Sequence, residues 1–522
     1  MRSPRSPRSP RSPRSPRSPL PLPREAGVVE RFRPAFTAPT YRRLLVLCVG
    51  AIVTMGRRSV SRILWSVRRL AGGHPSGYHR FFSRARWSPW PLARVLAAMA
   101  IELVPADQPV VVIADDTVDA HGGDHVFAKA CHRDAVRSSW TRAVFTFGHR
   151  WVVLAIGVKL PLCTRAWALP VLAALYRPPP KGSPATAQTT RPEAGAEKGG
   201  KKGGRTKGTK DGTKDGGGRK QRLVPDLRKR DPAGVLPPRH KTPALLARQM
   251  IATLMHWFPD RRFILLGDWG FASHDLAWFC HRHRRRVTLV ARTRSDLNLY
   301  ALPPRTKPPG RRGARPKKGR KLPHPRDAVA RAGDRRRATV RWYGDGVRGL
   351  ELLGGCGGWY RGRGGGRAAL VPVRWVYTHD PETGRDDYFY TTDPALTGER
   401  IVELFAARWP IEVTFEEARA HLGLGTTRQW CRNSVLRAAP CLLGLFTVVS
   451  LIYAELAGRT KVKVHATPCY PKTDPTFADA LAAVRRLLWE QVILPHTPGG
   501  GHVAELPPTI REMLLDHLTA AA

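Results

Sequence analysis

A long segment with few apolar side chains interrupts the sequence and limits where a folded core can form. Residues 178–242 are rich in Gly, Lys, Pro and Thr, with KKGGRTKGTKDGTKDGGGRKQR at their centre. Such a composition cannot bury enough apolar surface to offset the conformational entropy that folding removes. We therefore predict a disordered basic insert at 178–242, and a core built from the segments on either side of it.

The whole chain is strongly basic. Its 522 residues include 88 Lys and Arg against 40 Asp and Glu, a formal net charge of +48, while 42% hydrophobic residues are enough for a sizeable core. Because the charge is spread along the chain and is not confined to one amphipathic helix, nucleic acid is favoured over a membrane surface as the partner. A coding sequence rich in G and C would by itself account for part of the arginine excess.

The N-terminal residues favour an extended tail. Six consecutive Arg-Ser-Pro triplets occupy residues 2–19, and proline at every third position prevents an amphipathic helix. We predict a basic low-complexity tail at 1–40. This tail has no apolar stretch of the secretory type, and the eight cysteines show no paired CxxC spacing. We therefore expect reduced thiols in a cytoplasmic, nucleoid-associated protein.

Residues 41–105 show the periodicity of several short helices. Because many arginines alternate there with aromatic residues, we predict a helical DNA-binding region. The alternative is a helical cap on a catalytic domain, with a solvated basic face. The residues that motivate the DNA-binding interpretation are Arg57, Arg58, Arg62, Arg68, Arg69, Arg80, Arg84, Arg86, Tyr78, Phe81, Phe82 and Trp87.

Strand and helix patterns on both sides of the insert indicate an α/β fold. Before the insert, VVVIA ends at Asp115 and Asp116, and RAVFTFGHRWVVLAIGVKL predicts a hairpin of two buried strands turning near Gly148. After it come a helix at 244–258, the strand RFILLGD, a helix at 274–283 and the strand VTLVAR. This order favours an α/β core.

The domain boundaries follow from these patterns. The first part of the core spans 106–177 and its continuation spans 243–301. A basic loop and a β-rich insertion then occupy 302–398, with the strand-like segments RATVRWYG, LELLGG, ALVPVRWVYTHD and DDYFYTT. A catalytic helix and a core helix follow at 399–460, and a C-terminal helical tail at 461–522.

The helix predicted at 399–422 is the most informative segment for function. Phe405, Arg408, Glu412 and Arg419 are separated by three, four and seven residues, so they share one face of a helix. One carboxylate between two guanidinium groups suits metal and phosphate binding. The alternative is an amphipathic helix with solvated ion pairs. Pro410 indicates a kink, or the start of a new helix.

An uncharged stretch at 441–458 has roughly the length of a membrane span. Thr447, Ser450 and Pro440 interrupt its apolar character, and charged residues lie close to its ends. We therefore expect a buried core helix at this position.

Three acids occupy positions typical of a metal site. Asp116 ends the first strand, Asp268 ends the strand RFILLGD, and Glu412 lies on the late helix. Acids gathered at neighbouring strand ends repel one another unless a cation neutralises them, so these three predict a magnesium site. Two such ions activate water or a 3′ hydroxyl and stabilise the leaving oxygen of an in-line displacement.

With these acids in place, the chain resembles a DDE-type insertion-sequence transposase of the group with a Tyr-Arg-Glu-Lys signature. The signature spacing is matched by Phe405, Arg408, Glu412 and Arg419. The Asp-Asp-Thr typical of the first acid is matched at residues 115–117. The similarity covers most of residues 40–460, including YHRFFSRARW and RAHLGLGTTRQW.

The resemblance implies a ribonuclease-H-like fold, a mixed sheet flanked by helices, with metal-dependent cleavage at transposon ends and strand transfer into target DNA. Asp116, Asp268 and Glu412 would be catalytic ligands of two Mg²⁺ ions, with Mn²⁺ as a substitute. Arg408 and Arg419 would bind DNA phosphates. The implied partners are double-stranded DNA, as terminal inverted repeats and as target, and a second copy of the chain.

Two departures from the signature affect phosphate contacts. Phe405 lacks the phenolic hydroxyl of tyrosine, and Arg419 replaces lysine, which keeps the charge but changes its geometry. We expect Asp115 to point to the opposite face of its strand, and Glu416, one turn from Glu412, is the alternative third acid. The remaining candidates near the site are Glu417, His132 and His149, and we expect both histidines to be satisfied structural residues.

Two other functions compete with transposition. A decayed or repurposed copy would bind DNA without catalysis, and a stand-alone metal-dependent nuclease would cut nucleic acid without strand transfer. The presence of all three acids argues against decay. Phosphate-binding arginines beside the third acid favour a defined DNA end over random cutting.

Overall fold

The computed structural model describes residues 22–520 apart from 135–136, 140, 180–239, 305–315, 362–368, 461 and 466–470. Nearly all of the predicted insert and all of the Arg-Ser-Pro triplets lie outside the described residues. The chain divides into two compact units, and the fold described below belongs to the unit formed by residues 1–176 and 242–522.

Helices lie at both ends of the chain and between the strands. Their bounds in chain order are η1 Arg24–Ala35, α1 Ala38–Val53, α2 Val60–Ser66, α3 Ser76–Ser83, α4 Pro89–Glu102, α6 Pro243–Trp257, η3 Trp269–Phe271, α7 His274–Arg282, α8 Pro325–Arg331, η4 Tyr343–Asp345, α9 Gly398–Ala406, α10 Pro410–Leu422, α11 Arg432–Ala457, α12 Phe477–Leu488, η5 Trp489–Ile493, η6 Leu494–His496, α13 His502–Glu505 and α14 Pro508–Thr519.

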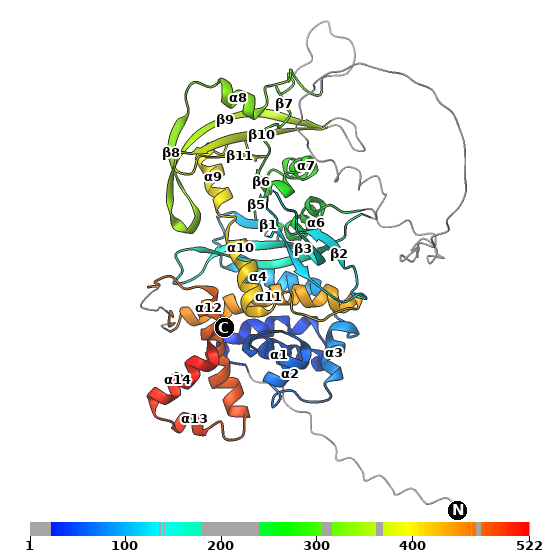
Figure 1. Cartoon of the computed structure of the whole chain (residues 1–522), viewed down its shortest axis with the longest axis vertical. Coiled ribbons are helices and arrows are strands. Elements are labelled where there is room, and N and C mark those ends of the chain that lie inside the picture. Colours follow the sequence, from blue (N-terminus) through cyan, green and yellow to red (C-terminus); the bar gives the residue numbers. More distant parts are fainter. Residues whose placement is uncertain are drawn as a thin grey trace, which may run out of the picture. The chain divides into compact units, whose positions relative to one another are not determined.

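Strands within the described residues join into a single mixed sheet. Their bounds are β1 Val110–Ala120, β2 Ala130–Arg133, β3 Phe145–Lys159, β4 Ala166–Tyr176, β5 Phe263–Gly267, β6 Val287–Arg292, β7 Leu299–Tyr300, β8 Arg336–Arg341, β9 Val347–Arg361, β10 Ala369–Asp380 and β11 Arg385–Thr391. The predicted α/β class is confirmed by this mixture of a large sheet with helices (Figure 1).

The centre of the sheet runs in the order β4, β3, β1, β5, β6. Strand β3 is antiparallel to both of its neighbours, β4 and β1, whereas β1, β5 and β6 are parallel. Ala114 of β1 pairs with Gly267 of β5, so the next residues along the two strands, Asp115 and Asp268, are brought to the same edge. Parallel pairing at this point therefore positions two of the acids.

Burial explains why β1 carries a continuous apolar run. Its residues Val110, Val112, Ile113 and Ala114 are fully buried, as expected for a central strand covered on both faces. Helices α6 and α7 precede β5 and β6 and supply the crossovers that parallel strands require. The run ends where the strand reaches the site and polar side chains begin.

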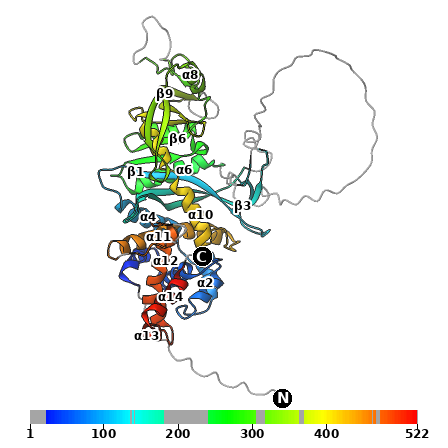
Figure 2. The same ribbon diagram turned by 60° about the vertical axis from the view of Figure 1, so that its left-hand side comes forward.

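Helix α11 is a core element. By length and composition alone it could cross a membrane, but 83% of its most apolar window is buried inside the protein. It contacts β4, α4 and α12, and Figures 1 and 2 show it between the sheet and the N-terminal helices. The Thr447 hydroxyl donates a hydrogen bond to the Pro170 carbonyl at 2.7 Å. These contacts agree with the predicted core helix.

The hairpin predicted near Gly148 is wrong. Residues Phe145–Lys159 form one continuous strand, β3, and the turn lies after it, because β3 pairs with β4. Gly148 instead permits close backbone packing, since a Cβ there would come within 1.7 Å of the Asp119 carbonyl oxygen. Strand β4, Ala166–Tyr176, was missed because its mostly apolar run has no polar alternation.

The N-terminal region is helical as predicted, but its aromatic residues serve the core. Tyr78, Phe81 and Trp87 are buried. Arg58 is buried too, and it donates hydrogen bonds to the backbone carbonyls of Gly56, Ala51 and His421. Part of the predicted tail also folds, because η1 buries Ala26, Val29 and Phe32.

Candidate active site

The late signature is divided between two helices. Helix α9 ends at Ala406 and α10 begins at Pro410, so a new helix starts at the proline instead of one helix being kinked. Proline suits the first turn of a helix because the missing N–H has no partner there in any case. Arg408 therefore lies in the short connection between α9 and α10, four residues before Glu412.

Arg408 is the centre of an acidic cluster. Only 7% of its surface is exposed. Its Nη1 donates to Asp115 Oδ2 at 2.6 Å, and its Nη2 donates to a Glu412 carboxylate oxygen. Burial disfavours its charge, yet Asp115, Glu412 and Asp268 outweigh burial and raise the pKa of the guanidinium. Arg408 thus pairs with carboxylates from β1 and α10, and the charge of Asp268 adds to their effect on its pKa.

Asp115 is the most deeply placed of these acids. Burial raises its pKa to about 7, against the opposing effect of Arg408, and the charges of Asp116 and Asp268 raise it further. Its Oδ1 accepts a hydrogen bond from the Asp116 backbone N–H at 2.8 Å. Asp268 ends β5, and its Oδ1 accepts from the Trp269 N–H at 2.6 Å, which starts η3.

The structure places Asp116 on the face of β1 opposite to Asp115. Its carboxylate pairs with Arg150 through two hydrogen bonds, one of them 2.8 Å from Nη2 to Oδ1, whereas Asp115 pairs with Arg408. Successive residues of a strand point to opposite faces, so only one of two adjacent aspartates can face α10. Which aspartate binds a metal ion stays a prediction.

Arg419 lies on the same side as Asp115. Its guanidinium donates to the Thr117 hydroxyl, two residues further along β1. Asp119, the next residue of this face, is buried, and burial raises its pKa to about 7 while Arg419 opposes the shift. Residues 115, 117 and 119 therefore line one face of β1, and both signature arginines contact that face.

The other candidate residues lie elsewhere. Glu416 is exposed. The Glu417 Oε2 atom lies 3.3 Å from His421 Nε2 on the same helix. Burial raises the pKa of Glu417 to about 7. His149 is satisfied by the Phe127 carbonyl at 2.8 Å, as predicted. The buried Nε2 of His132 has no hydrogen-bond partner among the described residues, which differs from the expectation.

Tyr343 is a site residue that the sequence did not suggest. It lies in η4, between β8 and β9, and its ring is 5.1 Å from that of Trp409, the residue after Arg408. Burial raises its pKa, while the nearby charge of Arg408 lowers it. Phe405 is buried against Phe389, and Tyr343 supplies a phenolic hydroxyl close enough for the charge of Arg408 to act on it.

Residues 31–349 match the family described as DDE superfamily endonuclease, which is more than half of the chain. The chain belongs to the DDE superfamily endonucleases. Members of this nuclease superfamily typically depend on divalent metal ions. The matched residues include Asp115, Asp116 and Asp268 but end before Glu412, so the place of Glu412 in the site rests on its contact with Arg408.

Comparison with other proteins adds little to this assignment. No curated protein matches the sequence. Among solved structures, the chain is similar to a piggyBac transposase synaptic complex with hairpin DNA, at 9% identity and a TM-score of 0.36, over 95% of this chain and 80% of the other. A similarity this distant carries no argument about fold or function.

The acids of this DDE endonuclease fit a divalent cation by their chemistry. Carboxylate oxygens are the ligands that Mg²⁺ prefers. Here they come from the residue after β5, from α10 and from within β1, which continues to Ala120 and does not end at Asp116 as predicted. Among the described residues no three His, Cys, Asp or Glu side chains have a metal-binding arrangement, since Arg408 lies between Asp115 and Glu412. The guanidinium supplies the positive charge that an ion would supply.

Proposed function

We propose that this chain is a DNA transposase of the insertion-sequence type with a ribonuclease-H-like core. The order β4, β3, β1, β5, β6, with three antiparallel strands followed by two parallel ones, supports this core. The family match supports an endonuclease of the DDE superfamily. The observation that carries the proposal is the pairing of Arg408 with both Asp115 and Glu412, together with the strand pairing that brings Asp268 to the same edge as Asp115.

The three carboxylates would hold the metal ions, with Asp115 in the role expected of Asp116. When bound, two Mg²⁺ ions supply an activated water or 3′ hydroxyl and stabilise the leaving oxygen. Arg408 reduces the repulsion among the acids while the site is empty of DNA. When a phosphodiester arrives, Arg408 and Arg419 can donate hydrogen bonds to its oxygens from the same face.

Exposed aromatic side chains border the acids. Trp269 follows Asp268 directly, Trp409 follows Arg408, and both have large exposed surfaces. With Tyr343 beside Trp409, the site has flat apolar surfaces for bases or sugars next to the groups that bind phosphates. This combination suits DNA better than a small phosphorylated metabolite, which would need an enclosing pocket.

The proposed partners follow from the charge and from this chemistry. Double-stranded DNA is the substrate, both as transposon ends and as target, and a net charge of +48 favours its binding without sequence preference. Joining two ends requires two active sites, so we propose a homodimer on DNA. The protein would act in the cytoplasm, associated with the nucleoid.

The deciding experiment uses the full chain and a supercoiled plasmid that carries the gene with its native flanking DNA. We expect Mg²⁺-dependent nicks at the gene's ends, loss of cutting with EDTA, and joined products detected by sequencing. Asp268→Asn should abolish cutting and leave DNA affinity near wild type. Asp275→Asn is the matched control, because Asp275 is an exposed acid seven residues further on.

The two rival functions give different outcomes in the same assay. Cutting without joined products would replace the transposase with a stand-alone nuclease. Binding without Mg²⁺-dependent cutting would indicate a DNA-binding protein without catalysis. Loss of DNA affinity in Asp268→Asn would contradict the assignment of Asp268, because removing one negative charge should not weaken binding to a polyanion.

A further inference from the structure

A concave surface is formed by residues outside the acidic cluster. It is a groove of about 990 Å³, lined by α2 and the residues that follow it on one side and by residues 489–498 on the other. Its volume is at the upper end of the range for ligand pockets. The segments that form it are separated by more than 400 residues in sequence, so only tertiary structure creates the groove.

The walls of the groove carry positive charge and an aromatic ring. Arg62, Arg68 and Arg69 line it and are exposed. No ion pair joins any of the three to an acid within the described part of the chain. Trp65 lies among them with 69% of its surface exposed, and the Arg68 guanidinium carbon is 4.8 Å from its ring centre. Trp65 and the three arginines thus present an exposed aromatic ring beside positive charge that no acid in the described segments neutralises.

Neighbouring contacts hold the two walls together. Arg485 of α12 is buried, and its Nε donates to the Ile52 carbonyl at 2.8 Å, which joins α12 to the end of α1. The Thr54 hydroxyl donates to Ser66 Oγ at 3.0 Å, which fixes the end of α2. The groove is therefore bounded by segments whose backbones are tied to one another.

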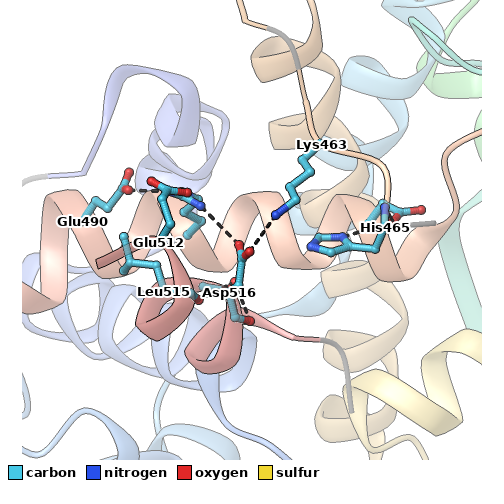
Figure 3. A network of polar contacts seen from close by, with 9 residues as sticks. Lys463, His465, Glu490, Glu512, Leu515 and Asp516 are labelled. Atoms are coloured by element: carbon cyan, nitrogen blue, oxygen red, sulfur yellow. Dashed lines mark hydrogen bonds and ion pairs between the residues drawn. The ribbon is translucent and has the colours of Figure 1, made fainter. Parts of the chain in front are cut away.

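The side of the groove formed by residues 489–498 is supported by a polar network between α12 and α14 (Figure 3). Arg486 binds Glu490, Glu512 and Asp516, and Lys463 binds Asp516 at 2.6 Å. These acids pair within the network and not with Arg62, Arg68 or Arg69. The C-terminal helices thus complete a basic groove without cancelling its charge.

We propose that this groove binds single-stranded DNA, with phosphates on Arg62, Arg68 and Arg69 and one base stacked on Trp65. The choice of DNA as the polymer rests on the proposed function. A single strand is favoured over a duplex because a base must leave its stack to reach an indole ring. Stacking on aromatic residues combined with a basic track is the usual way in which proteins bind single strands without sequence preference.

The inference gives two numerical expectations. Trp65→Ala should weaken binding of a 20-nucleotide oligothymidylate by about tenfold, within the range measured for one stacked base. Trp65→Phe should restore most of this loss, because phenylalanine keeps an aromatic face. The triple variant Arg62→Gln, Arg68→Gln, Arg69→Gln should reduce the slope of log K against log salt by about 2, since each phosphate contact on single strands contributes about 0.7.

Matched controls are available in the same region. Trp90 is also exposed, on α4, and Trp90→Ala should leave oligothymidylate binding unchanged. Arg80, Arg84 and Arg86 form an exposed arginine set in and after α3, and their triple Gln variant should change the slope by less than half as much. Fluorescence anisotropy measures all variants on the oligothymidylate and on a blunt duplex, and circular dichroism confirms folding.

The outcomes separate this inference from the proposed function. Base stacking in the groove is refuted if Trp65→Ala binds the single strand as tightly as wild type does. It is also refuted if the variant loses as much affinity for the duplex as for the single strand. Equal changes in the salt-dependence slope for the two triple variants would refute phosphate binding by Arg62, Arg68 and Arg69. Neither result depends on cleavage, whereas failure of wild-type cutting with intact groove binding would refute the transposase and leave the groove as proposed.

Discussion

The two faces of β1 differ in how they neutralise an aspartate. On one face, Asp116 pairs with Arg150, whose guanidinium lies over Tyr176 at 5.5 Å. On the other face, Asp115 and Glu412 both pair with Arg408, and the charge of Asp268 acts on the same guanidinium. The first arrangement has one acid for its arginine, whereas the second has two, with Asp268 at the same edge of the sheet. An excess of negative charge in a buried place is what a cation site requires, so the two neighbouring aspartates receive different roles.

The largest expected effect distinguishes these two aspartates. Asp115→Asn should reduce Mg²⁺-dependent plasmid nicking by more than about a hundredfold, because a carboxylate ligand is lost at the face that carries Glu412. Asp116→Asn should keep most of the activity. Nicking is measured on agarose gels with equal amounts of folded protein. If Asp116→Asn is the inactive variant, the comparison of the two faces is reversed.

The next effect concerns the stability of the acidic face. Arg408→Gln should lower the free energy of unfolding by about 3 kcal/mol without metal, because Asp115 and Glu412 lose their counter-charge in a buried site. Added Mg²⁺ should recover part of the loss by binding the folded state. Urea unfolding with and without Mg²⁺ measures both. A variant as stable as wild type in EDTA would show that Arg408 does not neutralise the cluster.

A smaller effect is expected on the opposite face. Asp116→Asn should lower the free energy of unfolding by about 1 kcal/mol, since Arg150 loses its acid but is one-third exposed to water, which screens its charge. The loss should not change with Mg²⁺. Recovery of stability on adding Mg²⁺ to this variant would indicate that an ion binds on the face of β1 that carries Asp116, which would contradict the comparison.

The smallest effect tests the phenol near the site. Tyr343→Phe should reduce cleavage by a few-fold and leave DNA affinity unchanged, because one neutral hydrogen bond contributes about 1 kcal/mol. Tyr176→Phe removes a phenol from the opposite face and should not affect cleavage. Equal rates for wild type and Tyr343→Phe would show that Tyr343 packs against Trp409 without contacting DNA.

Local patterns were enough to predict most elements of the core. Helices α6 and α7 and strands β5, β6, β10 and β11 lie where the periodicity placed them. The prediction of a hairpin at Gly148 was wrong. A glycine that lets two backbones approach closely has the same local sequence pattern as a glycine in a turn. Tyr343 was not predicted as a site residue, because it joins the site only through a packing contact with Trp409.

The sequence by itself determined that acids follow two apolar runs, that Glu412 lies near two arginines, and that the protein is strongly basic. Only the tertiary structure decided which of the two adjacent aspartates lies beside Glu412 and the arginines. An apolar run that is buried on both faces does not indicate to which face the next side chain points. Side chains alternate between the faces of a strand, but the packing of the neighbouring strand and helix decides which face meets the site. That choice was made by the pairing of β1 with β5 and by the start of α10 at Pro410, which directs Arg408 to Asp115.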